Sequence, residues 1–307
     1  MNWGSFKLRY WLGFDIGGTK IAAHLVNESN GVHWHMQRPT AKGTTLIPAV
    51  IEVVDLALQS IDQANDTLAG IGMGIPGKVV PELGEIHLAT NLDIETPIPI
   101  GPKLSERYGV PVYIENDVRL AAVGVQHSFE LDDFAYISIG TGLAAGFILD
   151  GKLFRGKNGL AGEIGHIVET FDGVPRILEN TISGPGLMRQ ALEAGCNAST
   201  PAELFSMADS GSEKAKVILQ NMFHHLARAI QWIALTFDIN KVVLGGGITQ
   251  IGESFECNLR QSVAILREQS KVAQLLLTDD KLIVLPKSHN PGLWGATHLV
   301  KNMTGLK

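Results

Sequence analysis

One segment near the start of the chain combines adjacent glycines with a hydroxyl, a cation and a carboxylate. It contains Asp15, Gly17, Gly18, Thr19 and Lys20. Adjacent glycines let the backbone turn tightly, so that main-chain N–H groups can approach a ligand. Asp15 would hold a hydrated Mg²⁺, a hard cation that prefers carboxylate, water and phosphate oxygens. The segment therefore suits a phosphate cradle, although the same glycines also suit an ordinary hairpin turn.

Two further glycine turns have the same character. The residues Gly140, Thr141 and Gly142 repeat the glycine–threonine combination, and a polyphosphate could be held between this turn and the first one. The run Gly245, Gly246 and Gly247 follows an apolar segment and precedes an expected helix. Backbone without side chains suits a flat nucleoside lying against it, and an ordinary strand-to-helix turn is the competing interpretation.

A polar group follows the apolar segment 112–114 and opens an expected helix. Asn116 and Asp117 stand at this point. Either side chain could simply cap the helix. A helix N-terminus also favours an ionised carboxylate, so Asp117 would be ready to accept a proton from a substrate hydroxyl. Asn116 offers both a donor and an acceptor to neighbouring hydroxyls.

A carboxylate and an imidazole stand three residues apart in a glycine-rich segment. They are Glu163 and His166, and Glu179 follows later in the chain. Carboxylate and imidazole groups that point into one site would bind the hydroxyls of a polyol.

The elements that position these groups show an internal repeat. The segments FDIGGTKIAAHLVN from Phe14 and ISIGTGLAAGFILD from Ile137 align without a gap at an offset of 123 residues. Each is an apolar strand, a glycine–threonine turn and a second strand, which predicts a β-hairpin. Strands then alternate with helical patterns, such as 46–61 and 219–237. This alternation favours an α/β fold with two related halves.

A formal GxGxxG match at 72–77 does not favour a dinucleotide site. A dinucleotide fingerprint must open a helix. Here Pro76 and Gly77 lead into the apolar residues 78–80, which we expect to form another strand.

Composition limits the partners and the compartment. The chain has 307 residues with a net charge of −6, and 45% hydrophobic against 18% charged residues exclude a disordered chain. A net negative chain has no general attraction to nucleic acid or to an anionic membrane. Two cysteines without a CxxC pattern suggest free thiols. No signal peptide or membrane span is evident, so we expect a soluble cytoplasmic protein.

Five motifs occur along the chain in this order: DIGGTK, GIPGKV, END, SIGTGLAAGFILDGKLFRGKNGLAGEIGH and VVLGGGIT. Together they resemble the ROK (repressor, open reading frame, kinase) family of bacterial sugar kinases and sugar-responsive repressors. The resemblance implies a duplicated actin/hexokinase-like (ribonuclease H-like) α/β fold, with two lobes around a cleft. We expect the small lobe at 1–117 plus the C-terminal helix 292–307, and the large lobe at 118–291.

The resemblance also implies residue roles. Asp117 matches the catalytic base, and the two glycine–threonine turns match the phosphate motifs, with Asp15 near Mg²⁺. Gly245 to Gly247 match the adenosine side. The expected sugar ligands are Asn91, Asn116, Glu163, His166 and Glu179.

The implied activity is Mg-ATP-dependent phosphorylation of glucose or a close relative at the 6-hydroxyl. Kinases for N-acetylated hexosamines, fructose or a β-glucoside stay open, as does polyphosphate as the donor. From another class, a non-catalytic sugar-binding regulator and a repressor are the alternatives. A repressor is disfavoured by the short segment before the first hairpin. The expected partners are a sugar and ATP, and a homodimer is a family-derived expectation.

The sequence departs from the family at a metal motif. Most members carry a CxCGxxGCxE segment after the GH pair, where three cysteines and the histidine hold a structural zinc. Here the stretch is Val174, Pro175, Arg176, Ile177, Leu178 and Glu179, without cysteine. One histidine cannot complete a tetrahedral zinc site.

We therefore predict that the purified protein contains no stoichiometric zinc, because the thiolate ligands are missing. Elemental analysis of the protein after gel filtration measures this directly. One zinc per chain would overturn the prediction.

Overall fold

The computed structural model describes residues 8–171, 173–287 and 289–305, and the chain divides into two compact units. The first consists of Met1–Leu131, Gly156–Leu160 and Asn290–Lys307. The second consists of Asp132–Arg155 and Ala161–His289. Each unit is built around its own five-stranded sheet.

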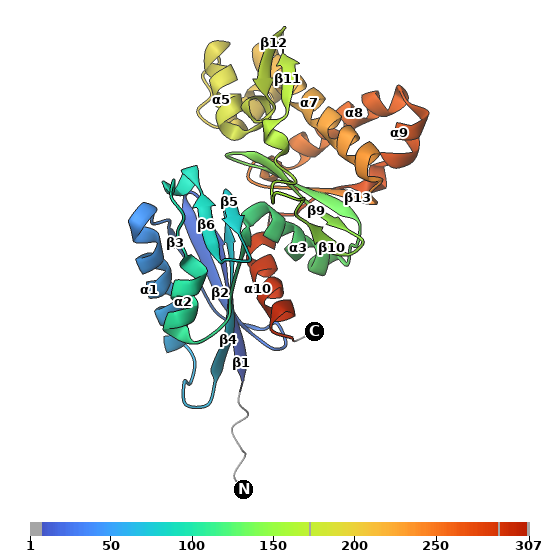
Figure 1. Ribbon diagram of the computed structural model, residues 1–307. Helices are drawn as coiled ribbons and strands as arrows, with labels where there is room; N and C mark the ends of the chain where they lie inside the picture. The colour runs from blue at the N-terminus through green and yellow to red at the C-terminus, as the bar shows by residue number, and fades with distance from the viewer. Residues whose placement is uncertain (1–7, 172, 288, 306–307) are drawn as a thin grey trace. The chain divides into compact units, whose positions relative to one another are not determined.

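The sheet of the first unit has the order β3-β2-β1-β4-β7. Its strands are β1 (Arg9–Ile16), β2 (Lys20–Asn27), β3 (Val32–Pro39), β4 (Thr67–Ile75) and β7 (Val112–Asn116). Helices α1 (Leu46–Gln59) and α2 (Ile100–Tyr108) cover one face, and α3 (Asp117–Phe129) and α10 (Pro291–Met303) cover the other (Figure 1). A small hairpin of β5 (Lys78–Val80) and β6 (Glu85–Leu88) follows β4. The strand expected at 78–80 is therefore confirmed, and the segment 72–77 opens no helix.

The sheet of the second unit has the order β10-β9-β8-β13-β14. Its strands are β8 (Phe134–Ile139), β9 (Leu143–Leu149), β10 (Lys152–Phe154), β13 (Lys241–Gly245) and β14 (Leu282–Val284). The helices are α4 (Glu179–Ile182), α5 (Gly184–Glu193), α6 (Pro201–Asp209), α7 (Glu213–Phe237), α8 (Glu253–Glu268) and α9 (Lys271–Leu276). A separate hairpin pairs β11 (Val168–Phe171) with β12 (Val174–Ile177).

The two sheets confirm the repeat that the sequence predicts. In each, the first three strands in the chain pair antiparallel. The central strand, β1 or β8, then pairs in parallel with a later strand, β4 or β13, which in turn pairs in parallel with the last strand, β7 or β14. The turns of the two hairpins differ in length by one residue, because Ile16 pairs with Ile21 in the first hairpin whereas Ile139 pairs with Leu143 in the second. The gapless alignment of the two hairpins therefore holds for the first strands and shifts by one residue after the turns.

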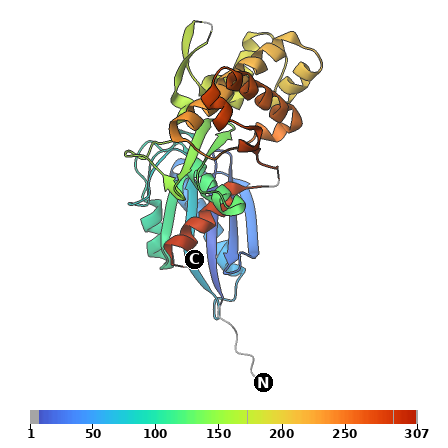
Figure 2. The ribbon, with the colours of Figure 1, turned by 90° about the vertical axis from the view of Figure 1, so that its right-hand side faces the viewer.

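The boundary between the units differs from the expected division at residue 117. Helix α3 lies in the first unit because it packs closely against α10 (Figure 2). A Cβ on Gly124 would lie 1.9 Å from the carbonyl oxygen of Pro291, and one on Gly295 would lie 1.8 Å from that of Leu120. Only glycine permits helices to approach this closely.

A histidine is buried where α10 covers the sheet. His24 on β2 is 2% exposed, and its Nε2 lies 2.5 Å from Oγ1 of Thr297. The ring of Trp294 packs edge-on against it, with centroids 4.9 Å apart. Burial lowers the pKa of His24 to about 4, because the apolar surroundings disfavour the charged imidazolium.

This burial predicts acid sensitivity of the first unit. In the unfolded chain His24 takes up a proton as the pH falls through about 6.5, whereas the folded protein resists protonation until about pH 4. The contribution of neutral His24 to the free energy of unfolding is therefore complete above pH 6.5 and is lost as the pH falls. At pH 5 the loss from this one group is about 2 kcal/mol. Urea unfolding followed by tryptophan fluorescence at pH 7 and pH 5 measures the decline. The decline in the free energy of unfolding should be smaller in His24→Gln. It should be unchanged in His33→Gln, because the His33 side chain is exposed. Equal declines in both variants would contradict the assignment.

Candidate active site

In the first unit, the predicted residues gather at the carboxyl ends of three parallel strands. Asp15 on β1 pairs with Gly74 on β4, and Gly74 pairs with Glu115 on β7. Asp117 follows at the first position of α3. Neighbouring strands lie about 4.8 Å apart, so Asp15 and Glu115 lie about 10 Å apart, and Asp117 follows Glu115 by two residues at the same edge of the sheet. Ligands bind at this edge in open α/β sheets.

Asp15 has the environment of a cation ligand. A Cβ on Gly292 would lie 2.9 Å from the Asp15 carboxyl carbon, so the first turn of α10 covers this side chain. Burial raises the pKa of Asp15, and the charge of Lys20 only partly offsets this effect. A bound cation would compensate the buried charge, and a carboxylate is the donor that Mg²⁺ prefers. The residues present therefore fit Mg²⁺.

Asn91 lies beside the first glycine turn. It is exposed in a short helical turn, and a Cβ on Gly18 would lie 3.1 Å from its Cβ. The turn itself is closed by a hydrogen bond from the Gly17 N–H to the Lys20 carbonyl, 2.8 Å. Thr19 and Lys20 are exposed. The structure thus brings Asn91 together with the turn that contains Gly17, Gly18, Thr19 and Lys20.

Asn116, expected to bind sugar, is the N-cap of α3 in this structure. Its Oδ1 accepts from the N–H groups of Val118 and Arg119, at 3.1 and 3.2 Å, and its Nδ2 donates to the Gly77 carbonyl at 3.2 Å. The side chain is 7% exposed. The capping interpretation therefore holds for Asn116, and one amide hydrogen stays available. Asp117, half-buried, accepts from the N–H of Val118 at 2.9 Å.

Sequence reasoning missed a buried ion pair below this edge. Glu115 and Arg119 are 0% and 2% exposed, and Arg119 Nη1 lies 3.2 Å from Glu115 Oε1. Nη2 of Arg119 donates to the Gly159 carbonyl at 2.5 Å. The pair therefore holds residues 156–160 against the first unit. The i,i+4 spacing of the two charges was a signal that could have identified it.

In the second unit, two of the glycine turns line one cavity of about 420 Å³. Gly140 and Thr141 contribute from the β8–β9 turn and Gly247 from the segment after β13. The remaining lining was not predicted from the sequence, and it comprises Gly184, Pro185, Thr200, Pro201, Ala202, Ile248 and Ile251. The first turns of α5 and α6 therefore both border this cavity. The N–H of Gly184 donates to the Gly140 carbonyl and that of Gly186 to Oγ of Ser183, and Thr200 caps α6 in the same way. The positive ends of the two helix dipoles, rather than free N–H groups, therefore favour an anion here.

The three glycines after β13 have different structural requirements. Gly246 has φ +95°, and a Cβ there would lie 2.4 Å from the Ile139 carbonyl oxygen. A Cβ on Gly245 would lie 2.5 Å from the hydroxyl of Tyr136. Gly247, by contrast, has no atom within 4 Å of its Cβ position and no positive φ. The fold itself therefore requires glycine at 245 and 246 but leaves open space at 247.

The second predicted sugar group lies beside the same turn. Glu179, the first residue of α4, accepts from the Leu143 N–H at 2.9 Å through Oε2. A Cβ on Gly142 would lie 2.8 Å from this oxygen, and one on Gly165 would lie 3.2 Å from the Glu179 Cβ. Glu163 and His166 flank a short helical turn at 164–166, and His166 is exposed. Glu179 is thus joined to the Gly140–Gly142 turn and lies against the segment of Glu163 and His166.

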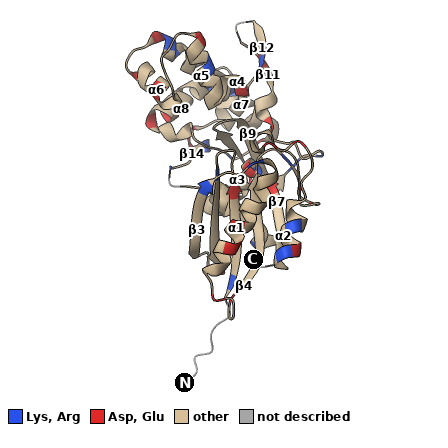
Figure 3. Cartoon of the chain, turned by 90° about the vertical axis from the view of Figure 1, so that its left-hand side faces the viewer, with Lys and Arg blue, Asp and Glu red and all other residues tan. Residues whose placement is uncertain are grey.

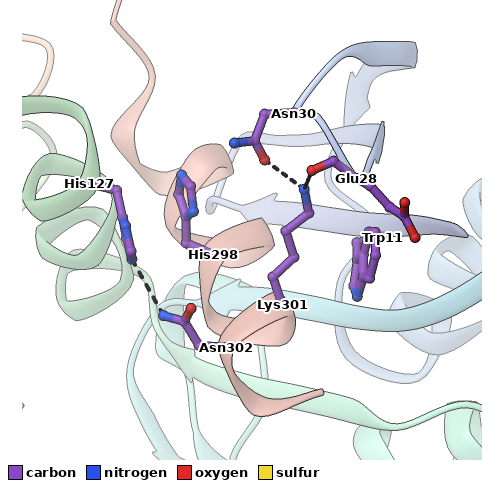
Figure 4. Close-up of a pocket in the computed structure, with 7 residues that line it drawn as sticks. All are labelled: Trp11, Glu28, Asn30, His127, His298, Lys301 and Asn302. Atoms are coloured by element: carbon purple, nitrogen blue, oxygen red, sulfur yellow. Dashed lines mark hydrogen bonds between the residues drawn. The ribbon is translucent and has the colours of Figure 1, made fainter. Parts of the chain in front are cut away.

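A second cavity, of about 410 Å³, lies in the first unit away from every predicted site residue. Figure 4 shows His298, Lys301 and Asn302 reaching it from α10 and His127 from α3, while Trp11 comes from β1 and Glu28 and Asn30 from the turn between β2 and β3. The ammonium group of Lys301 is fully engaged by oxygens of Asn27, Glu28 and Asn30, at 2.6–3.3 Å. This cation therefore anchors α10 to the end of the first hairpin.

Charged residues of both signs share the surface. Figure 3 shows lysine or arginine beside aspartate or glutamate on α2 and around α6. Among the described residues, no helix is both long and apolar enough to cross a bilayer.

Comparison with known proteins agrees with this architecture. The ROK family model matches residues 11–303. A glucokinase of Halalkalibacterium halodurans is 28% identical over 280 residues, which are 82% of this chain and 84% of that protein. An N-acetylmannosamine kinase of Vibrio cholerae is 31% identical over 248 residues, 77% of this chain and 83% of that protein. The solved structure of a ROK family glucokinase from Streptomyces griseus, in complex with glucose and AMPPNP, is 26% identical, has a TM-score of 0.73 and covers 95% of this chain and 99% of that one.

A regulator is also among the relatives. The xylose repressor of Caldicellulosiruptor bescii is 28% identical over 251 residues, 75% of this chain and 62% of the repressor. The two sheets of equal topology and the relatives define a duplicated actin/hexokinase-like α/β protein. The chain belongs to the ROK family, as the ordered motifs predict.

Gly247 offers a test of the cavity in the second unit. A leucine at this position would project into open space, so Gly247→Leu should fold normally but weaken the binding of an adenine nucleotide at least about tenfold by occlusion. Isothermal titration with AMPPNP and Mg²⁺ measures binding, and calorimetric melting measures folding. Gly246→Ala is the matched contrast, because its backbone strain should lower the melting temperature. Unchanged nucleotide affinity in Gly247→Leu would remove the cavity from nucleotide binding.

Proposed function

We propose that this protein is an ATP-dependent sugar kinase, which phosphorylates glucose or a close relative at the 6-hydroxyl. The observation that carries the proposal is the cavity shared by the turns of Gly140–Thr141 and Gly247. Two helix N-termini border it, and Ile248 and Ile251 add apolar surface. Such a combination suits a nucleoside polyphosphate, because the base needs apolar contact and the positive ends of the helix dipoles attract the phosphates.

The phosphates of ATP need charge neutralisation more than covalent chemistry. Main-chain N–H groups of the Gly17–Thr19 and Gly140–Gly142 turns would donate to phosphate oxygens, and Lys20 would add positive charge. Mg²⁺, when bound beside Asp15 through water, would neutralise part of the phosphate charge. Preorganised groups of this kind stabilise the charge that develops during transfer.

Asp117 would accept the proton of the attacking hydroxyl. Its position at the first turn of α3 supports this role, because the helix dipole favours the ionised carboxylate. Asn91, Asn116, Glu163, His166 and Glu179 would orient the sugar by hydrogen bonds. In this proposal the first unit supplies the base and the second unit supplies the main nucleotide contacts.

The identity of the sugar belongs to the same proposal. The relatives comprise a glucokinase and an N-acetylmannosamine kinase, so glucose and N-acetylated hexosamines are the leading substrates, with fructose and β-glucosides next. We further propose a cytoplasmic location, a homodimer and no nucleic-acid or membrane partner. A panel of hexoses and hexosamines with Mg-ATP, and with polyphosphate as the alternative donor, ranks these substrates by ADP or phosphate-ester release.

A non-catalytic regulator is the second candidate, because a xylose repressor is among the relatives. The carboxylates Asp15 and Asp117 and both glycine–threonine turns favour catalysis. Sugar binding without turnover of any donor in the panel would favour the regulator.

Replacement of the proposed base tests the mechanism. Asp117→Asn preserves the size of the side chain but cannot accept the proton, so kcat should fall by about 10²–10⁴. Sugar affinity, measured by titration calorimetry, should change little. Asp93→Asn, an exposed residue next to the same edge, is the control. Near-normal turnover of Asp117→Asn would exclude this residue as the base.

A further inference from the structure

The β11–β12 hairpin joins two of the proposed sugar ligands. His166 lies two residues before β11, and Glu179 lies two residues after β12. The base of the hairpin is closed by a hydrogen bond from the Leu178 N–H to the Ile167 carbonyl, 2.8 Å. Any movement of the hairpin therefore displaces the segments on which both side chains are carried.

Few side chains fix this hairpin to the rest of the second unit. Val174, Pro175 and Arg176 on β12 are exposed, as are Val168 and Thr170 on β11. Glu169 and Phe171, on the opposite face of β11, are 6% and 9% exposed. The hairpin thus depends on this one face of β11 for its position.

Both buried residues contact the same histidine of α7. The carboxylate oxygen Oε2 of Glu169 is hydrogen bonded to Nδ1 of His225, and the Phe171 and His225 rings lie 3.9 Å apart. His225 itself is 7% exposed. Helix α7 spans 25 residues, of which many are buried in the core of the unit. The histidine is therefore presented by a rigid element.

The electrostatics explain why a pair is needed here. A buried carboxylate without a partner is costly. Burial lowers the pKa of His225 despite the opposing effect of Glu169, so at neutral pH a neutral imidazole donates its Nδ1–H to the carboxylate. The other oxygen, Oε1, has no hydrogen-bond partner among the described residues, and Arg228 lies 3.7 Å from it. His225 thus supplies the main polar contact of the Glu169 carboxylate.

We propose that Glu169 and His225 are positioning residues for sugar binding, which hold the β11–β12 hairpin on α7 and so fix His166 and Glu179. This inference rests on the proposed kinase function. Glu169 lies on the hairpin and His225 lies on α7, so the pair joins the hairpin to a helix of the core.

The position of the pair predicts which kinetic constant changes. Glu179 reaches the Leu143 N–H beside the Gly140–Gly142 turn, whereas most of the lining of the cavity near Gly247 comes from the starts of α5 and α6 and from residues 247–251. Loosening the hairpin should therefore raise KM for the sugar by a larger factor than KM for ATP. A merely structural role would lower the melting temperature and change both constants together.

The experiment compares Glu169→Leu with the conservative Glu169→Gln. Loss of the charge-assisted hydrogen bond in Glu169→Leu should raise the sugar KM at least about tenfold. Glu169→Gln can still accept from His225 and should recover most of the affinity. His225→Gln provides a second variant should Glu169→Leu fail to fold. Thr170→Ala, on the exposed face of the same strand, is the control and should match the wild type.

Hydrogen exchange provides a readout that does not depend on turnover. Amides of residues 167–171 and 174–178 should exchange faster in Glu169→Leu than in the wild type and the control, while α7 stays protected. An active wild type with unchanged sugar KM and unchanged exchange in Glu169→Leu would overturn the inference. If the wild type phosphorylates no sugar and Glu169→Leu still exchanges faster than the wild type, the proposed function is contradicted, while the pair's hold on the hairpin stands.

Discussion

Close approach of two helices to one face of the first sheet is the constraint on which the remaining site geometry depends. The alternating glycines Gly70, Gly72 and Gly74 of β4 present this face, and a Cβ on Gly72 would lie 2.0 Å from the Ala296 carbonyl oxygen. Side chains there would push α10 off the sheet. Because α10 lies directly on the strands, its first turn reaches Asp15, and α3 begins beside Gly74 with Asp117.

This constraint also gives a different meaning to the GxGxxG match. Two of its glycines, Gly72 and Gly74, serve helix packing, and Gly77, with φ +89°, forms the turn into β5. A glycine pattern in the sequence does not distinguish a backbone that approaches a phosphate from one that approaches a helix. The following residues did distinguish them here, because Pro76 and the apolar run 78–80 favoured a strand.

Much of the fold was readable from the sequence because local patterns determine it. The two hairpins, α1, α7 and α10 follow from apolar periodicity and turn residues. The position of α3 in the first unit was not readable, since it depends on contacts with a helix more than 160 residues later. For the same reason the ends of α5 and α6 at the cavity were missed. Of the site residues, the turns, Asp117 and the capping role of Asn116 have sequence signals, whereas the hydrogen bond from Asn116 to the Gly77 carbonyl depends on the pairing of β4 with β7.

The buried charges divide between two tasks in this chain. Glu115 and Arg119 compensate one another and hold a loop, and Glu169 with His225 holds a hairpin. Asp15 differs from both, because burial raises its pKa and only Lys20 opposes the effect. A buried pair contributes little net stability but fixes a geometry, whereas an under-compensated carboxylate is best stabilised by a cation that arrives with the substrate. Asp15 is therefore the carboxylate beside which we propose that a cation binds.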